Sequence, residues 1–186
     1  AFLFHLAGMS LFDAINHSMT AIATGGFSTK NGSLAHYGNP LIEAVGVLIM
    51  VLGATSFSVH YGLLVRGENP LRNPEVVAML ALLALFVPSI AACLLAYSSM
   101  EVPDVLRFSL FESVSALSGT GFTIGPLYGQ AKVYNGFTKL LLTILMVIGG
   151  GYGSTSSAIK LFRLVLAIKY IRWALKKELF PSIALP

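Results

Sequence analysis

The sequence predicts an all-α membrane protein made of tandem repeats, each with a short helix that enters the membrane without crossing it. The composition and a duplicated motif support this prediction. The chain has 186 residues, of which 55% are hydrophobic and only 11% are charged, whereas ordinary soluble domains carry about 25% charged residues. Three long runs, residues 44–59, 76–99 and 140–159, contain no Asp, Glu, Lys or Arg. A bilayer core about 30 Å thick is crossed by about 20 such residues in a helix.

The first part of the chain predicts a short helix followed by a longer one. Ser10 and Asp13 have the spacing of a capping box, with a carboxylate near a helix N-terminus. A helix over residues 11–23 would be roughly 20 Å long, too short to cross a membrane. Residues 30–40 are polar and contain turn signals. The following segment, residues 41–65, is long enough to cross as one helix.

The second part predicts the same order with one more helix in front. Prolines and charges in residues 66–75 indicate a loop, so we expect one repeat over residues 1–70 and the next over residues 71–186. Residues 76–97 form the clearest membrane-spanning helix, in which Pro88 is tolerated as a kink. A second short helix is expected from Asp104 to Leu117, with Asp104 as its cap.

A glycine-rich segment interrupts the last predicted spanning helix. The helix that starts at residue 140 reaches a run of small residues that no ordinary helix carries at mid-membrane, and helical character resumes at residues 158–177. We predict that this run is an intramembrane loop that acts as a gate. Its residues are Gly149, Gly150, Gly151, Tyr152, Gly153, Ser154, Thr155, Ser156 and Ser157.

Each of the two short helices ends in a loop of small, uncharged residues, and the two loops match at a separation of 95 positions. Gly26 corresponds to Gly121, and Phe27 corresponds to Phe122. Glycine permits backbone conformations in which carbonyl groups point the same way, and rings of loop carbonyls hold dehydrated cations in potassium channels. The predicted ion-binding residues of these filter loops are Ala23, Thr24, Gly25, Gly26, Ser118, Gly119, Thr120 and Gly121.

The predicted filter favours a monovalent cation. The C-terminal end of each short helix, which carries the negative end of the helix dipole, would point toward mid-membrane. Neither loop contains Asp, Glu or His, whereas sites for divalent ions usually recruit carboxylates. We therefore expect carbonyl oxygens, with the hydroxyls of Thr24 and Thr120, as ligands in a potassium-channel-like, re-entrant arrangement.

The sequence resembles the Trk/Ktr/HKT potassium transporter superfamily, and most closely the pore-forming subunit of bacterial Trk uptake systems. The resemblance rests on residues 23–29, residues 53–61 and the run from Gly149 to Arg163. It implies that the chain covers the second and third of four membrane-pore-membrane repeats. It also implies that Gly26 and Gly121 are filter glycines and that the interrupted helix carries the gate.

The same resemblance implies the setting of the protein. It implies a multi-pass protein of the bacterial inner membrane, in contact with lipid, that takes up potassium as its substrate without a cofactor or enzymatic activity. Its partners would be the first and fourth repeats, a second copy in a homodimer, and a cytosolic nucleotide-binding regulatory subunit, with no role for nucleic acid. Six of the twelve basic residues follow residue 159, as the positive-inside rule requires of a cytosolic end. Lys160 and Arg163 either line the inner mouth of the pore or extend to the interface.

Three alternatives remain at the level of sequence. The loop Gly119-Thr120-Gly121 differs from the commoner pattern of the superfamily, which leaves a sodium-permeable or poorly selective transporter open. Ser154 with His17 or His60 would suggest an intramembrane serine hydrolase, although no Gly-x-Ser-x-Gly elbow is present. Finally, the small residues could simply allow close helix packing, and Glu112 could either support the filter from behind or face outward.

Overall fold

The computed structural model describes residues 1–98, 100–129 and 133–179, and within these ranges the secondary structure is entirely helical. The chain thus has the all-α architecture that its composition predicts. The α-helices are α1 (Phe2–Leu6), α2 (Leu11–Ile22), α3 (Pro40–Ala54), α4 (Phe57–Arg66), α5 (Pro74–Tyr97), α6 (Val102–Ser118), α8 (Gly136–Ile148) and α9 (Leu161–Leu179). In the described part of the chain, three short 3-10 helices connect them: η1 (Ser33–Tyr37), η2 (Pro70–Arg72) and η3 (Gly125–Tyr128).

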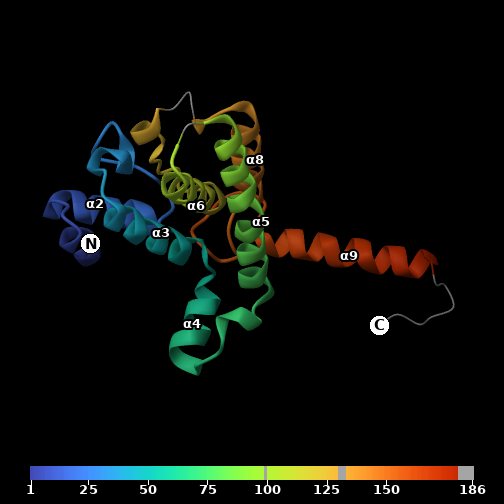
Figure 1. The fold of residues 1–186 in the computed structure, drawn as a ribbon. Helices are drawn as coiled ribbons and strands as arrows, with labels where there is room; N and C mark the ends of the chain where they lie inside the picture. Colours follow the sequence, from blue (N-terminus) through green and yellow to red (C-terminus); the bar gives the residue numbers. More distant parts are fainter. Residues whose placement is uncertain (99, 130–132, 180–186) are drawn as a thin grey trace.

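Helix α6 lies at the centre of the molecule. It packs against α3, α5 and α8, and α2 packs against α3. Eleven of its 17 residues are buried, among them Phe108, Phe111 and Leu117, which belong to the main hydrophobic core. Figure 1 shows α6 surrounded by these helices, while α9 extends away from them. The second predicted short helix is therefore also the most enclosed element.

Helix α5 has the length and composition of a membrane-spanning segment. Its 24 residues correspond to about 36 Å, and only 33% of its most apolar stretch is buried inside the structure. Among the described residues it is the one helix that meets both criteria alone; α8 is apolar but shorter. Pro88 lies inside α5 without ending it, as predicted.

The segment 41–65 differs from its prediction as one spanning helix. It is divided into α3 and α4, which meet at an angle of 97°. Only the two helices taken together are long and apolar enough to cross a membrane. Thr55 adopts an extended conformation and Ser56 caps α4 by accepting a hydrogen bond from the Ser58 amide. The helix therefore ends within a run of small residues, where a Ser cap can begin a new helix in another direction.

The start of α2 agrees with its prediction, whereas α6 and α9 start elsewhere; α9 begins at Leu161 and not at residue 158, because Ala158 and Lys160 have positive φ angles. Ser10 caps α2, since its Oγ accepts a hydrogen bond from the Asp13 amide at 3.1 Å. Helix α6, however, begins after Glu101, so Asp104 lies in its first turn and is not the cap. Asp104 instead accepts a hydrogen bond from Tyr128 at 3.1 Å, and its prediction as the helix cap is wrong. The prolines at 181 and 186, which follow α9 in the sequence, lie outside the described residues.

An ion pair joins the two predicted repeats through the packed faces of α3 and α6. Arg107 donates to both carboxylate oxygens of Glu43, from Nε at 2.5 Å and from Nη2 at 2.6 Å. The Glu43 side chain is only 4% exposed. Its negative charge is therefore stabilised by this bidentate contact with Arg107 and not by water. Sequence reasoning did not single out this pair, although a carboxylate in a spanning segment requires a partner.

Candidate functional site

The two predicted filter loops have the same internal hydrogen bonds. The Thr20 hydroxyl donates to the Phe27 carbonyl at 2.8 Å, and the Ser115 hydroxyl donates to the Phe122 carbonyl at 2.6 Å. Both members of each pair are 95 positions from their counterparts. Two backbone hydrogen bonds at the end of each short helix also recur at this separation. After α2, the amides of Thr24 and Gly25 donate to the carbonyls of Ala21 and Thr20. After α6, the amides of Gly119 and Thr120 donate to the carbonyls of Ala116 and Ser115.

The two loops also share their unusual backbone angles. The φ angles of Thr24 and Gly26 are +50° and +65°, and those of Gly119 and Gly121 are +71° and +86°. These are corresponding positions, so the chain enters the left-handed region twice in each loop at the same places. Glycine adopts this region without the steric cost that other residues carry, and Thr24 is the exception. The duplicated sequence therefore encodes a duplicated backbone path.

The loops meet each other. A Cβ atom on Gly26 would overlap the carbonyl oxygen of Thr120, and it would lie 2.9 Å from the Thr120 carbonyl carbon and 3.3 Å from that of Gly121. No side chain fits between these two stretches of backbone. The structure thus brings Gly26 and Gly121, which are distant in sequence, into one place.

The remaining predicted filter residues lie around this contact. Thr24, Ser118 and Thr120 are buried, whereas Ala23, Gly25 and Gly121 are exposed. The hydroxyls of Ser118 and Thr120 bond each other at 2.7 Å, and Thr24 donates to the Ala23 carbonyl at 2.8 Å. These hydroxyls are therefore already paired within their loops, which leaves carbonyl groups as the better candidate ligands. No group of three or more His, Cys, Asp or Glu side chains suited to a metal occurs in the described residues.

The glycine-rich segment between α8 and α9 lies against the end of α2 and against the second loop. The Thr155 hydroxyl is 2.8 Å from the Ile22 carbonyl at the end of α2 and 2.9 Å from the Gly53 carbonyl of α3. A Cβ on Gly119 would lie 3.5 Å from the Ser157 hydroxyl and 3.7 Å from the Ser156 hydroxyl. The predicted gate loop therefore touches the helix that leads into the first filter loop and the first residue of the second.

Backbone hydrogen bonds hold the gate loop against the bend between α3 and α4. The Gly151 amide donates to the Ala54 carbonyl at 2.8 Å, and the Phe57 amide donates to the Gly153 carbonyl at 3.2 Å. Glu75 of α5 adds a third attachment by accepting from the Tyr152 amide at 2.7 Å. The two interruptions in the helices thus dock on one another.

Lys160 and Arg163 differ in their positions. The Lys160 ammonium group donates to the Ser154 carbonyl at 3.3 Å and to the Ser156 carbonyl, so it lies on the gate loop itself. Arg163 is exposed on α9. Of the two candidate residues for the inner mouth, Lys160 is the one in contact with the predicted gate loop.

The arrangement required for a serine hydrolase is absent from the described part of the chain. The Ser154 hydroxyl donates to the Gly151 carbonyl at 2.6 Å. His17 bonds the Asp13 carbonyl and Ser28, and His60 bonds the Leu52 carbonyl at 2.9 Å. Neither histidine is engaged with Ser154.

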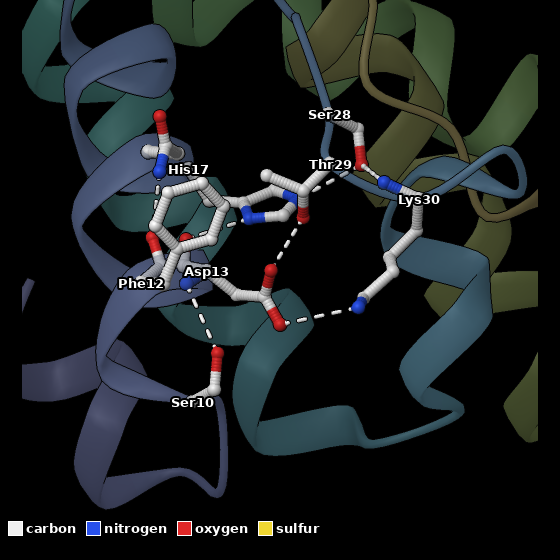
Figure 2. A network of polar contacts seen from close by, with 8 residues as sticks. Ser10, Phe12, Asp13, His17, Ser28, Thr29 and Lys30 are labelled. Carbon is white, nitrogen blue, oxygen red and sulfur yellow. Dashed lines mark hydrogen bonds and ion pairs between the residues drawn. The ribbon is translucent and has the colours of Figure 1, made fainter.

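Sequence reasoning considered His17 only as a hydrolase residue, and it left the position of Glu112 open; both are buried next to the predicted filter loops. His17 on α2 bonds Ser28, and Glu112 on α6 bonds Thr123, directly after the two loops. Figure 2 shows His17 among the polar groups at the far end of the first loop. The signal was in the sequence, because His17 and Glu112 are also 95 positions apart, as are Ser28 and Thr123.

Comparisons with known proteins agree with this architecture. A family model described as a cation transport protein, TrkH, matches residues 4–83. The chain is 31% identical over 186 residues to an uncharacterised cation transporter of Methanocaldococcus jannaschii, covering 98% of this chain and 35% of that protein. It is 32% identical over 171 residues to the Trk system potassium uptake protein TrkH of Vibrio parahaemolyticus, covering 89% and 34%.

The fold matches a solved structure as well. The crystal structure of the potassium transporter TrkH from Vibrio parahaemolyticus superposes with a TM-score of 0.89 at 30% identity, over 99% of this chain and 40% of that chain. The chain spans about a third of the length of the curated relatives it matches. These relatives are transporters and not enzymes.

Proposed function

The chain belongs to the Trk family of cation transport proteins, and from this premise we propose that it forms part of a potassium-conducting pathway in a bacterial inner membrane. Potassium would pass along the carbonyl groups of residues 23–26 and 118–121. The observation that carries the proposal is the backbone contact between Gly26 and the Thr120–Gly121 peptide. Two loops with the same helix-end hydrogen bonds and no carboxylate meet there, as a carbonyl-lined path for a monovalent cation requires.

The gate loop, Gly149 to Ser157, has the second role in this proposal. It contacts α2 at Ile22 and lies next to Gly119, so a displacement of the loop would open or close the path beside both filter loops. Non-helical backbone at membrane depth is tolerated where it is buried in protein or lines a water-filled cavity. Lys160, which donates to two carbonyls of the loop, would help to hold it in place.

The proposal includes neighbours that complete the pore. Potassium filters use four loops, so the first and fourth repeats of a multi-pass protein would supply the other two. Phe27 supports this, because its side chain is 78% exposed while its counterpart Phe122 is 1% exposed. In the complete protein, one of these further repeats would cover Phe27, as the hydrophobic core covers Phe122. By likeness to Trk potassium uptake systems, the partners would also include a second copy and a cytosolic nucleotide-binding regulator.

Uptake by the complete protein tests the function. We expect it to restore growth at low potassium, and to carry rubidium, in bacterial cells that lack their own potassium uptake. Gly26→Ala should reduce uptake at least about tenfold, because the added methyl group overlaps the Thr120 carbonyl and no ordinary relaxation removes a clash with backbone. Gly8→Ala is the matched control, since Gly8 also has a positive φ but has open space around it and lies outside the loops.

The result also separates potassium from sodium transport. Potassium permeability well above sodium permeability supports the proposal. Equal permeability of the two ions would favour the poorly selective alternative, for which the Gly119-Thr120-Gly121 sequence is the argument. Normal uptake by the Gly26→Ala protein would show that this contact is not part of the ion path.

A further inference from the structure

A second pair of residues, buried behind the filter loops, recurs at the same separation as the loops themselves. His17 is 0% exposed and Glu112 is 6% exposed. They occupy corresponding positions on α2 and α6, and each bonds the hydroxyl of the residue that follows the filter phenylalanine. The distances are 2.8 Å from His17 Nε2 to Ser28 Oγ and 2.7 Å from Thr123 Oγ1 to Glu112 Oε1.

The hydrogen bonds of His17 fix the direction of each contact. Its Nδ1 lies 2.7 Å from the Asp13 carbonyl oxygen, which can only accept, so Nδ1 carries the hydrogen. In the neutral imidazole Nε2 then has a free lone pair, which accepts the proton of the Ser28 hydroxyl. The Ser28 oxygen in turn accepts from the Lys30 amide at 3.1 Å. The first loop therefore ends in a chain of hydrogen bonds that begins inside α2.

Packing holds the His17 ring in this orientation. The rings of Phe4, Tyr37 and Phe122 surround it, with centroids 6.4, 5.8 and 5.8 Å away. Phe122 belongs to the second filter loop, so His17 contacts both loops. It bonds the end of one and packs against the other.

Glu112 has the same role with more partners. One carboxylate oxygen accepts from the Thr123 hydroxyl and, at 2.9 Å, from the Ile124 amide. The Thr123 oxygen is also 2.6 Å from the Tyr134 hydroxyl and accepts from the Gly125 amide at 2.9 Å. The Tyr134 ring packs so closely on Gly125 that a Cβ at residue 125 would lie 2.5 Å from the ring, so only glycine fits there.

These contacts anchor each loop at two successive residues. The hydroxyls of Thr20 and Ser115 hold the carbonyls of the two phenylalanines, and His17 and Glu112 hold the next side chain in each loop. The carbonyl groups just before these anchors are the proposed ion ligands. Their spacing and freedom to move decide how well a filter distinguishes ions of different size.

We propose that His17 and Glu112 are positioning residues that set the potassium-to-sodium selectivity of the two loops, an inference that rests on the proposed filter function. Neither residue touches the ion. Each acts through the hydroxyl that it bonds, Ser28 for His17 and Thr123 for Glu112. The two repeats thus use different side chains, an imidazole and a carboxylate, for one structural task.

The test is the potassium-to-sodium permeability ratio of the complete transporter, measured in reconstituted bilayers together with its thermal stability. His17→Leu should lower the ratio about threefold to tenfold, the effect of one lost hydrogen bond of ordinary strength. Glu112→Leu loses the bonds from both Thr123 and Ile124 and should lower the ratio at least as much. His17→Gln and Glu112→Gln keep an acceptor for the hydroxyl and should retain most of the ratio. His36→Leu and Glu101→Leu are the matched controls, because both residues are exposed and outside the network.

Double variants separate positioning from general damage. In the His17→Leu protein, adding Ser28→Ala should lower the ratio less than Ser28→Ala does alone, since the shared bond is already lost; Thr123→Val should behave likewise with Glu112→Leu. If a Leu variant does not fold, Ser28→Ala and Thr123→Val alone decide the matter by the same ratio. An unchanged ratio in these folded variants, with a selective wild type, would overturn this inference alone. A wild type that does not conduct potassium would overturn the proposed function instead.

Discussion

At the residue scale, the filter loops depend on a few backbone angles more than on side-chain chemistry. Gly26, Gly119 and Gly121 have positive φ angles at positions that recur in both loops, and Gly26 also has no room for a Cβ atom. Thr24, with φ of +50°, adopts the same conformation as Gly119 despite its branched side chain. The loops thus combine positions that need glycine for space with positions that need it only for conformation.

Gly119→Ala distinguishes these two requirements. Its Cβ would have ordinary contacts, the nearest being Ser157 Oγ at 3.5 Å, so the cost should come from the left-handed backbone alone. We expect a loss of about 1–2 kcal/mol in unfolding free energy, measured by thermal unfolding in detergent. Gly136→Ala at the start of α8, where there is open space and no positive φ, is the control. Equal stability of the two variants would mean that residue 119 tolerates another conformation.

At the element scale, two interruptions in helices pack against each other next to the loops: the bend between α3 and α4, and the segment between α8 and α9. The bend of 97° between α3 and α4 exposes carbonyl groups of Gly53 and Ala54, which the gate loop uses as acceptors. Helix ends leave such carbonyls without partners inside the helix. The gate loop satisfies them, and it is itself held in place by the same bonds.

Thr155→Val tests this mutual support. The substitution keeps the shape of the side chain but removes the hydroxyl that contacts the carbonyls of Ile22 and Gly53. Loss of a hydrogen bond worth about 1 kcal/mol should loosen the loop and raise potassium uptake about threefold to tenfold at saturating potassium. Thr143→Val is the control, since the Thr143 hydroxyl bonds only Lys139 of its own helix. Unchanged or lower uptake in the Thr155 variant would argue against a loop held closed by this residue.

At the scale of the whole molecule, the two predicted repeats are joined by α6. It carries the second filter loop at its end, packs on α3 of the first repeat, and forms the buried ion pair between Arg107 and Glu43. The packing of side-chain ridges into grooves already restricts the crossing angle between two helices. The paired charges of Arg107 and Glu43 add one directional contact between α3 and α6.

Arg107→Met should therefore cost more than the loss of a surface contact. It leaves the Glu43 carboxylate, whose side chain is 4% exposed, without its partner, and we expect about 2–4 kcal/mol of destabilisation in a thermal unfolding assay. Arg66→Met, which removes an exposed contact to Glu68, should cost less than about 1 kcal/mol. Adding Glu43→Met to Arg107→Met should recover part of the loss. No recovery would show that the unpaired charge is not the cause.

The sequence by itself determined the helical membrane architecture, the duplicated loops and the position of the non-helical interruption that begins at Gly149. Each of these follows from local composition: apolar runs longer than a bilayer, small residues after short helices, and a 95-residue separation that can be read without coordinates. The glycines were identifiable because their backbone requirement is local. For the same reason the start of α2 at Ser10 was correct.

The tertiary structure alone decided which segments meet. The break at Thr55–Ser56 was predicted as continuous helix because apolar composition does not reveal where tertiary hydrogen bonds will replace helical ones. The contact of Gly26 with Thr120, the contact of Thr155 with Ile22, and the pairing of Glu43 with Arg107 all join residues more than 60 positions apart. Such contacts depend on how the helices pack in three dimensions, which the pattern along one helix does not contain.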